Sequence, residues 1–435
     1  MVASAPGGRH VNVLWVIVDC LRADMLARPR AEWPVASRLV DEGTAFTACY
    51  STCPTTTPAF TSMFTGRYPT SHGVRGLRGT RLSDAMPTVA ERLSAVGYAT
   101  WCSVTGPLLQ TVGTFRGFEE VEYREAGDRS VHSEFGVRAL ARVAGLETAG
   151  RPYLGVIHIW DVHMPRRYPA RFDSRRYGRD VYERALAGFD PWLGTLLSLV
   201  GDDTLVVFTG DHGENTRLEP RTLRTQELHR RAVRRLPVIP WAQWTLNRGA
   251  RSDSKRLLQL APRHLWGHGQ TLFEPLVRVP LVFRGAGAVP GRLETPVSHV
   301  DLGPTLLALA GIVPGAGWQG QSLAGSVRGG SEPPARPVAM EIAGEPKMPP
   351  VRQRAIRDGR HKLITSFDDA RWAEALYDLE ADPHERTNLA RRMPDVADRL
   401  RAKLRALVAE EAETVAIAGD EDEEIADRLR ELGYL

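Results

Sequence analysis

Three short and almost entirely apolar runs constrain the fold of this chain more than any other feature. They are 11–18 (VNVLWVIV), 153–160 (YLGVIHIW) and 204–208 (TLVVF). Each is short for a helix and rich in β-branched residues, which favours strands buried on both faces of a mainly parallel sheet. Apolar residues at helical spacing lie between them, for example in 88–96 and 181–200. The pattern predicts an α/β fold, with a large, mainly parallel sheet flanked by helices.

Polar residues stand directly after each of these runs. They are, in chain order, Asp19, then Asp161 and His163, then Asp211 and His212. Open α/β sheets place their sites at the carboxyl ends of the strands, because the loops that leave the strands converge there. We therefore expect these side chains to meet at one edge of the sheet.

Asp19, Asp211 and His212 provide the oxygen and imidazole donors that suit one divalent cation, such as Mn²⁺, Zn²⁺, Mg²⁺ or Ca²⁺. Taken singly, each has an ordinary alternative, because an Asp after a strand is often a helix N-cap. The adjacent Asp-His pair in TGDHGE favours the metal interpretation, since its flanking glycines allow close backbone approach. No second complete set of ligands at strand ends is evident in the sequence.

The segment 51–73 (STCPTTTPAFTSMFTGRYPTSHG) places several hydroxyl groups just ahead of a predicted helix. The free N–H groups and positive dipole end of a helix N-terminus can bind an oxyanion or a phosphate. Thr-Thr-Pro before a helix is, however, also common N-capping chemistry. The residues alone leave both interpretations open.

Composition excludes several broad classes of protein. The 435 residues carry 56 basic and 52 acidic side chains, and a net charge of +4 gives no strong nucleic-acid signal. The four cysteines contain no C-x-x-C pair, so we expect free thiols. No transmembrane segment is expected, because no run approaches the ~20 apolar residues that span a bilayer, and the N-terminus lacks a secretion-signal pattern. A cytoplasmic protein is the resulting expectation, and a homo-oligomer is compatible with it.

The chain divides by composition into three parts. We expect a catalytic domain over 1–337, an antiparallel subdomain over 338–412, and an acidic stretch with a terminal helix over 413–435. Within the first part, 217–263 contains twelve Arg or Lys and separates Asp211-His212 from the segment around 268. We interpret 217–263 as a basic insertion that forms a lid over the site.

Eight motifs, in order from residue 11 to the C-terminus and interrupted by 217–263, resemble the sulfatase branch of the alkaline phosphatase superfamily. They are NVLWVIVDCLRADML, TTTPAFTSMFTGRYPTSHGV, VIHIWDVHMP, VVFTGDHGE, WGHGQTLFEPLVRVPLVFRG, VSHVDLGPTLLALAGI, AIRDGRHKLI with LYDLEADPHERTNLA, and the terminal LGYL. The resemblance implies a large α/β/α domain, one divalent metal, an esterified anion bound to that metal, and a covalent intermediate on a nucleophile at the start of a helix.

By this resemblance Asp19, Asp211 and His212 fall on metal-ligand positions, and Thr56 falls on the position of the nucleophile. In sulfatases the nucleophile is a cysteine or serine within C/S-x-P-S-R that becomes formylglycine, whereas this chain has TTPAF at 56–60. Thr56 cannot become formylglycine. An unmodified threonine is instead similar to the lipoteichoic-acid-synthase and nucleotide-pyrophosphatase branches, whose substrates are phosphate esters.

The resemblance also implies roles for further residues near the substrate. His163 and His268 match loop histidines that would contact the ester's oxygens or its leaving group, and the alternative for each is a structural histidine. Thr105 stands in the strand-end segment VTGP that replaces the sulfatase lysine motif, and Arg75 and Arg78 flank a leucine where an asparagine is expected. We assign Arg75, Arg78 and Thr105 to substrate binding.

Four other residues in these motifs receive no catalytic role. We assign structural roles to Asp24, His299 and Asp301, which also stand in motifs similar to those of the family. Cys20, directly after Asp19, is expected to border the site without acting.

The functional hypothesis is hydrolysis, or transfer, of phosphate mono- or diesters through a phospho-threonine on Thr56, with His268 or His163 protonating the leaving oxygen. One alternative is a sulfatase that acts on sulfate esters without formylglycine. A second alternative is a non-catalytic protein that binds an acidic partner through the basic insertion. The substrate expected under the first two is an anionic ester.

Overall fold

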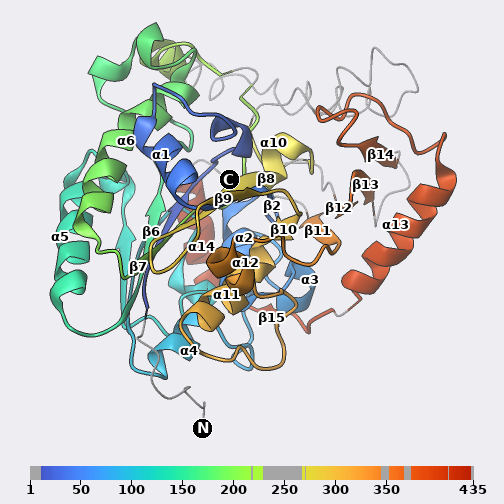
Figure 1. Cartoon of the computed structure of the whole chain (residues 1–435), viewed down its shortest axis with the longest axis horizontal. Coiled ribbons are helices and arrows are strands. Elements are labelled where there is room, and N and C mark those ends of the chain that lie inside the picture. The colour runs from blue at the N-terminus through green and yellow to red at the C-terminus, as the bar shows by residue number, and fades with distance from the viewer. Residues whose placement is uncertain are drawn as a thin grey trace.

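A large sheet lies at the centre of the molecule, with helices on both of its faces (Figure 1). The computed structural model describes residues 11–216, 219–228, 267–269, 271–343, 352–366, 374–409 and 411–432. In this part of the chain the large sheet has nine strands. Its strands, in spatial order, are β10 (Val297–Ser298), β2 (Thr44–Tyr50), β8 (Arg278–Arg284), β7 (Thr204–Gly210), β1 (Asn12–Val18), β6 (Tyr153–Ile159), β4 (Ala99–Thr105) and β5 (Glu120–Arg124), with β9 (Gly291–Leu293) paired to β2.

The sheet is mainly parallel, as the apolar runs predict. Strand β1 pairs in parallel with both β6 and β7, and only β8 runs antiparallel to its neighbours β7 and β2. A hydrogen bond between the residues that flank the two strands explains the antiparallel direction of β8. Gly213, just after β7, donates its N–H to the carbonyl of Leu276, just before β8 (2.9 Å). The chain therefore enters β8 from the edge at which β7 ends.

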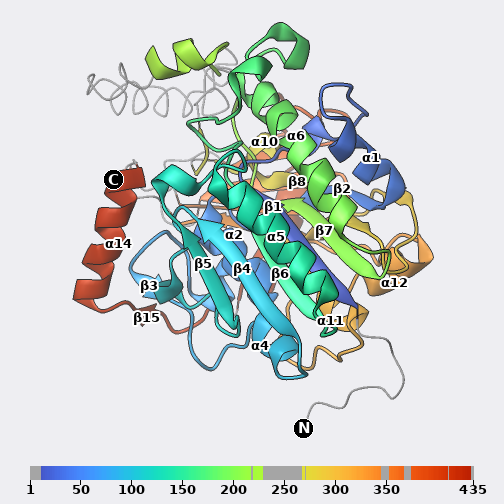
Figure 2. The same cartoon turned by 90° about the vertical axis from the view of Figure 1, so that its left-hand side faces the viewer.

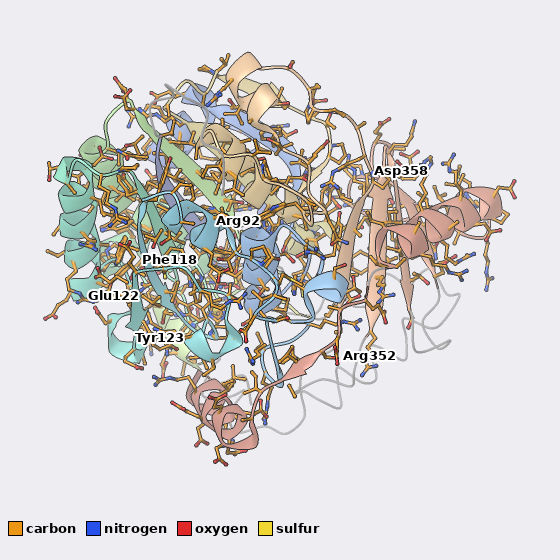
Figure 3. The ribbon with its side chains drawn as sticks, turned by 90° about the horizontal axis from the view of Figure 1, so that it is seen from below. Arg92, Phe118, Glu122, Tyr123, Arg352 and Asp358 are labelled. Carbon is orange, nitrogen blue, oxygen red and sulfur yellow. The ribbon has the colours of Figure 1, made fainter. Side chains whose placement is uncertain are left out.

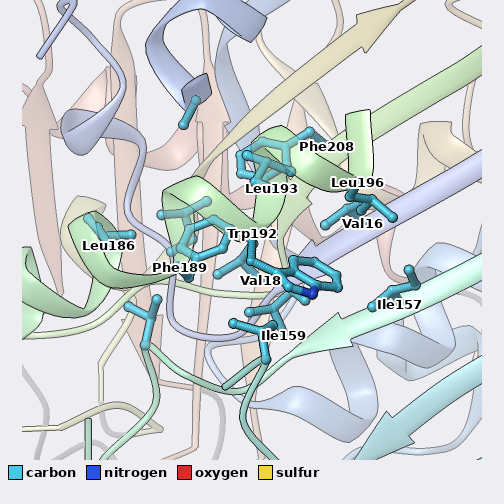
Figure 4. Packing of buried hydrophobic residues seen from close by; sticks show 14 of the residues in the cluster. Val16, Val18, Ile157, Ile159, Leu186, Phe189, Trp192, Leu193, Leu196 and Phe208 are labelled. Carbon is cyan, nitrogen blue, oxygen red and sulfur yellow. The ribbon is translucent and has the colours of Figure 1, made fainter. Parts of the chain in front are cut away.

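Both faces of the central strand, β1, are covered by apolar residues, which explains its continuous hydrophobic sequence. Successive side chains of a strand point to opposite faces. Val13, Trp15 and Ile17 accordingly join the core on one face, and the alternate residues of β1 join the core on the other. Figure 4 shows the core on this other face, in which Val16 and Val18 pack beside Trp192 and other residues of helix α6 (Val181–Leu199).

Helices cover the sheet on both sides. Figure 2 shows α5 (Glu134–Thr148) and α6 (Val181–Leu199) across the near face, where α1 (Pro34–Glu42) packs against α6. The other face is covered by α2 (Thr56–Thr65), α4 (Val89–Ser94), α11 (Leu302–Leu309) and α12 (Ala324–Gly329). The predicted helices at 88–96 and 181–200 are α4 and α6. A capping box between Thr88 and Glu91 begins the first, and the Asp180 carboxylate accepts the N–H of Glu183 at the start of the second.

A second, antiparallel sheet forms the C-terminal subdomain at the right of Figure 1. The hairpin between β12 and β13 turns at Asp358-Gly359, where Gly359 has the left-handed φ of +57° (Figure 3 labels Asp358). One face of the sheet packs against α13, and the other packs against Tyr50, Leu272 and neighbouring residues of the large domain. The elements of this subdomain are β11 (Val338–Ile342), β12 (Gln353–Asp358), β13 (His361–Ser366), β14 (Ala375–Asp378) and α13 (Pro394–Leu407).

The last part of the chain returns to the large domain. Strand β15 (Val415–Ala416) pairs with β3 (Thr80–Arg81), and Ile425 and Leu429 of α14 (Gly419–Leu432) pack against Leu77. The remaining short elements are α3 (Pro69–His72), α10 (Glu274–Val277), η1 (Ala23–Met25), η2 (Gln110–Val112), η3 (Ala126–Asp128), η4 (Ala170–Phe172), η5 (Arg175–Tyr177) and η7 (His299–Asp301).

Most of the predicted basic insertion 217–263 lies outside the described residues, so the lid remains a prediction. Its described part, 219–228, packs beside Arg166: the Gln226 amide oxygen accepts the Arg166 N–H (2.8 Å), and the Gln226 amide nitrogen donates to the Arg166 carbonyl (3.1 Å). All four cysteines are buried free thiols, as expected. Within the described residues, none of the helices has the length and apolar character needed to cross a membrane.

Candidate active site

The ends of two neighbouring strands, β1 and β7, bring the predicted metal ligands together. Asp19 follows β1 and is fixed by its N–H, which donates to the Ile159 carbonyl at the end of β6 (2.9 Å). Asp211 and His212 follow β7. The ligand atoms of these three residues lie within 4.8 Å of one another, and all three side chains are fully buried.

The lone pairs in this cluster face one another, as they would around a cation. His212 Nδ1 lies 2.8 Å from the Gly213 carbonyl, which can only accept, so Nδ1 is the protonated nitrogen. The other ring nitrogen, Nε2, then faces Asp211 Oδ2 (3.4 Å) and Asp19 Oδ1 (3.8 Å). Asp211 Oδ2 is buried and has no hydrogen-bond donor in the described part of the chain. Buried acceptors without a donor are costly, and a bound cation would satisfy them.

The two carboxyl groups differ in their electrostatic surroundings. Burial alone would raise the pKa of Asp19, but His163, together with His158 at 3.2 Å and His212, holds that pKa well below its ordinary value. Burial and the negative charge of Asp19 raise the pKa of Asp211 instead. The histidines thus dominate the surroundings of Asp19, whereas at Asp211 burial and the charge of Asp19 outweigh the effect of His212 and His158.

Thr56 lies at the first residue of α2 and contacts the cluster directly. Its Oγ1 is 3.3 Å from His212 Nε2 and 3.5 Å from Asp19 Oδ2, and the residue is 1% exposed. The N-cap of α2 is Thr55, which makes no side-chain capping hydrogen bond. The hydroxyl of Thr56 is therefore directed to the cluster, whereas the N-capping alternative would have used a threonine hydroxyl on the helix backbone.

His163 and His268 border the same cluster. The rings of His212 and His268 lie 4.4 Å apart, and those of His163 and His268 lie 5.2 Å apart. Burial lowers the pKa of His163 to about 3, and its ring stacks on Trp160 at 3.9 Å. Burial would also lower the pKa of His268, but the Glu214 carboxylate, 3.4 Å from its Nδ1, raises that pKa above the ordinary value. His268 is thus the better proton donor of the two.

Sequence reasoning missed three residues that support this cluster. His158 lies in β6 and faces Asp19, and a histidine inside an otherwise apolar strand was the signal for it. Glu214 holds His268 and is itself held by Arg166 (3.3 Å), whose guanidinium also binds Glu219 (2.5 Å). Glu214 follows the Asp-His pair directly in TGDHGE, but nothing in the local sequence indicated its partner Arg166.

The hydrogen bonds of the predicted substrate-binding residues lead to other parts of the chain. Arg75 Nε donates to Glu341 in β11 (2.6 Å), and Arg78 pairs with Asp422 in α14. Thr105 Oγ1 donates to the Arg124 carbonyl at 2.6 Å. The contacts of Arg75 and Arg78 link the large domain to the C-terminal elements β11 and α14. The contact of Thr105 joins strand β4 to its neighbour β5. They do not bring the three residues to the cluster, so substrate binding by them stays a prediction.

The residues given structural roles have structural contacts. Asp301 accepts the N–H groups of Ser298 and Gln321 (both 2.8 Å), and His299 Nε2 lies 3.0 Å from the Gly210 carbonyl. Asp24 pairs with Arg22 at the surface.

A comparison with known families identifies the family of the chain. Residues 11–312 match the family model described as Sulfatase, which covers more than half of the chain. The chain belongs to the sulfatase family. Residues 263–410 also match the model of the N-sulphoglucosamine sulphohydrolase C-terminal region, which overlaps the antiparallel subdomain. The resemblance inferred from the eight motifs is thereby confirmed.

Curated relatives of this sulfatase-family chain align over part of their length. The choline-sulfatase of Rhizobium meliloti is 31% identical over 226 residues, which are 50% of this chain and 34% of that protein. Arylsulfatase K of Mus musculus is 31% identical over 164 residues, which are 34% of this chain and 28% of that protein. The matches thus span about a third of the relatives' own length.

Solved structures share the fold over nearly the whole chain. The phosphonate monoester hydrolase of Agrobacterium radiobacter superimposes with a TM-score of 0.66 at 18% identity and covers 92% of this chain and 96% of its own. A protein solved in complex with its substrate D-glucosamine-2-N,6-O-disulfate gives a TM-score of 0.68 at 16% identity, covering 96% of this chain and 100% of its own. The α/β fold with its C-terminal antiparallel sheet is thus that of the sulfatase and alkaline phosphatase superfamily.

Proposed function

We propose that this chain is a metal-dependent hydrolase of anionic esters, with Thr56 as its nucleophile and phosphate or phosphonate esters as its preferred substrates. The observation that supports this most is the position of the Thr56 hydroxyl, at a helix N-terminus and 3.3–3.5 Å from His212 and Asp19. An activated nucleophile needs such neighbours, because a threonine hydroxyl is a weak nucleophile by itself.

The residues present fit a divalent cation. Asp19, Asp211 and His212 would hold it, since Asp211 Oδ2 has no donor among the described residues and His212 Nε2 faces two carboxylate oxygens at 3.4 and 3.8 Å. When bound, such an ion supplies positive charge that makes the nearby hydroxyl more acidic and neutralises the ester's oxygens.

The residues of the chain then have distinct roles in the reaction. The Thr56 hydroxyl loses its proton to solvent, and its oxygen attacks phosphorus in line with the leaving oxygen, so that the Thr56 O–P bond forms as the bond to the leaving alcohol breaks. The leaving oxygen accepts a proton from His268, whose protonated form is favoured by Glu214. The N–H groups at the start of α2 face the oxyanion. Water, or an acceptor alcohol in a transfer reaction, then releases phosphate from Thr56.

The preference for phosphorus over sulfur rests on the identity of residue 56. Threonine cannot be converted to formylglycine, so the chain lacks the modified nucleophile that its resemblance to sulfatases implies. The phosphonate monoester hydrolase among the structural neighbours supports the fold's suitability for phosphorus esters. The curated relatives are named sulfatases, and this observation favours sulfate-ester hydrolysis through the unmodified threonine as the second candidate.

A substrate screen tests the proposal. The purified protein is supplied with Mn²⁺, Zn²⁺, Mg²⁺ or Ca²⁺ and assayed with the 4-nitrophenyl phosphate, phosphodiester, phenylphosphonate and sulfate esters. A kcat/KM that is highest for one of the phosphorus esters supports the proposal. The highest value for the sulfate ester would favour the second candidate. No turnover of any ester with any metal would favour the non-catalytic alternative, in which the basic insertion binds an acidic partner.

A further inference from the structure

Exposed arginine side chains lie on two segments that extend from the loops of the candidate active site. The first segment, 171–176, belongs to the loop between β6 and α6, and the second, 221–224, follows β7. We call these side chains the arginine surface, and they are Arg171, Arg175, Arg176, Arg221 and Arg224. The reaction described above uses none of them.

Direct contacts join the two segments. The N–H of Leu223 donates to Asp173 Oδ2 (3.2 Å), and the guanidinium of Arg184 binds both Asp173 Oδ1 (2.7 Å) and the carbonyl of Arg221. In the sequence, the arginines of the first segment flank Asp173 and those of the second flank Leu223. The five side chains of the arginine surface therefore come together around one point of contact.

Other arginines bind the carboxylates next to the arginine surface. Besides the pair of Asp173 and Arg184, Glu183 pairs with Arg179. Glu219 pairs with the buried Arg166. Within the described residues, the arginine surface takes part in no ion pair. Its positive charge is therefore available to an anion from outside the chain.

Two aromatic rings orient part of the arginine surface. The guanidinium carbon of Arg171 lies 4.9 Å from the ring centroid of Phe172, and that of Arg176 lies 5.5 Å from the centroid of Tyr177. The two rings contact each other at 4.7 Å, and Phe172 is a member of the apolar core. Contact with a ring restricts a guanidinium, so less side-chain entropy is lost when an anion binds. Arg171 and Arg176 are thus a pre-oriented pair.

The two segments are linked to the candidate active site by short connections and by one buried ion-pair network. The loop that carries the first segment also carries His163, at its start. Arg166, in the same loop, binds Glu219 (2.5 Å) and Glu214 (3.3 Å), and Glu214 lies 3.4 Å from His268 Nδ1. The arginine surface is therefore attached to the residues that surround the reacting ester.

We propose that the arginine surface binds a linear polymer with repeated phosphate groups, and that such a polymer is the substrate of this chain. The proposal rests on the proposed function, since the polymer's reacting ester is the one that Thr56 attacks. A small ester has one anionic group, which the site itself binds, whereas five further exposed cations suit a ligand with additional anionic groups. The planar guanidinium of arginine binds phosphate oxygens in pairs. Several such contacts along one chain add to its affinity.

Direct binding tests the proposal with a signal that does not depend on activity. Full-length protein is titrated into fluorescein-labelled linear polyphosphate at several NaCl concentrations, and fluorescence anisotropy gives the Kd. The double variant Arg171→Gln/Arg176→Gln should bind at least about tenfold more weakly than the wild type. Loss of two phosphate contacts should also lower the slope of log Kd against log [NaCl] by about 1–2.

The matched control removes the same charge from another surface. Arg399 and Arg405 are exposed on α13, in the C-terminal subdomain, and Arg399→Gln/Arg405→Gln should keep the wild-type Kd. A second measurement links the arginine surface to the candidate active site. Polyphosphate should inhibit hydrolysis of the best aryl ester competitively and more strongly than inorganic phosphate does. Inhibition that is not competitive would overturn the polymer as substrate.

The outcomes separate this proposal from the proposed function. Wild-type protein that does not bind polyphosphate, or an equal loss of affinity in the two double variants, would overturn the role of the arginine surface and leave the turnover of small esters intact. Tighter binding of heparin would indicate a sulfated polymer, and tighter binding of phosphatidylcholine–phosphatidylglycerol vesicles would indicate a membrane, so either result would overturn the proposal. No turnover of any ester, with polyphosphate bound as predicted, would overturn the proposed function and the polymer as substrate, but not the binding surface.

Discussion

At the scale of single residues, the proposed reaction depends on Thr56 and the two side chains that its hydroxyl contacts. Its hydroxyl is buried, begins a helix, and lies against Asp19 and His212. The neighbouring Thr57 differs, because its hydroxyl donates to the Pro107 carbonyl (3.0 Å) and so points to another loop. Two adjacent threonines thus provide the proposed nucleophile and a matched control.

Thr56→Ala should lower kcat for the best ester by at least about 10³-fold, because the attacking oxygen is removed. Metal content should remain that of the wild type. Thr57→Ala, measured in the same steady-state assay, should retain activity within about tenfold. A Thr56→Ala variant as active as Thr57→Ala would exclude residue 56 as the nucleophile.

Asp211→Ala should abolish metal binding, because it removes the carboxylate oxygen that has no other partner in the described structure. Elemental analysis of the wild type should give about one metal per chain, in keeping with one ion at Asp19, Asp211 and His212. Asp24→Ala, at an exposed ion pair, is the control and should keep its metal. Two metals per chain in the wild type would require a second set of ligands.

The sequence predicts part of this site and not the rest, for a physical reason. Asp19, Asp211 and His212 could be grouped because the ends of parallel strands must converge. The partners of Arg78 and Arg75 could not be predicted, since Asp422 and Glu341 are separated from them by 344 and 266 residues. The left-handed backbone of Cys20, which borders the site beside Asp19 as expected, likewise leaves no pattern in the sequence.

At the scale of elements, the long apolar strands and the capped helices could be predicted, whereas the contacts between domains could not. Strand β13 carries Lys362, which is fully buried and lies 2.9 Å from both Glu274 of α10 and Glu385. Burial would raise the pKa of Glu274, but Lys362 and Arg357 lower it. Helix α10 in turn provides the carbonyl that accepts the N–H of Gly213, beside His212. The C-terminal sheet thus supports the loop of the metal ligands.

Lys362→Ala should destabilise the protein by about 3–5 kcal/mol, because it leaves two carboxylates buried without their cation. Lys403→Ala is the control: Lys403 pairs with Asp358 at the surface, and such a pair contributes about 0–1 kcal/mol. Chemical denaturation with urea measures both values. Equal effects in the two variants would show that the buried network does not join the two domains.

At the scale of the whole molecule, the end of the chain packs against residues of its first part. The composition of 413–435 predicts an acidic stretch with a terminal helix, and this helix, α14, packs its apolar face on the large domain and anchors Arg78 through Asp422. The hydrophobic spacing within this helix was visible in the sequence, while the surface that it covers depends on Leu77 and Leu109, more than 300 residues earlier.

Leu429→Ala should cost about 2–5 kcal/mol of unfolding free energy, because Leu429 is completely buried between α14 and the large domain. Leu228→Ala, at a leucine that is 57% exposed, should change the stability by less than about 0.5 kcal/mol. Thermal unfolding followed by circular dichroism compares the two variants with the wild type. A Leu429→Ala variant as stable as the wild type would mean that α14 does not stabilise the domain.

The most direct test of the central claim is the detection of a phosphoryl group on Thr56 during turnover. The metal-loaded enzyme is mixed with the best phosphorus ester, quenched in acid within the first turnovers and digested, and its peptides are sequenced by mass spectrometry. The account predicts a phosphoryl group on Thr56, absent without substrate and absent from Thr56→Ala. An active enzyme that never carries the group on Thr56, or that carries it on another residue, would contradict the account.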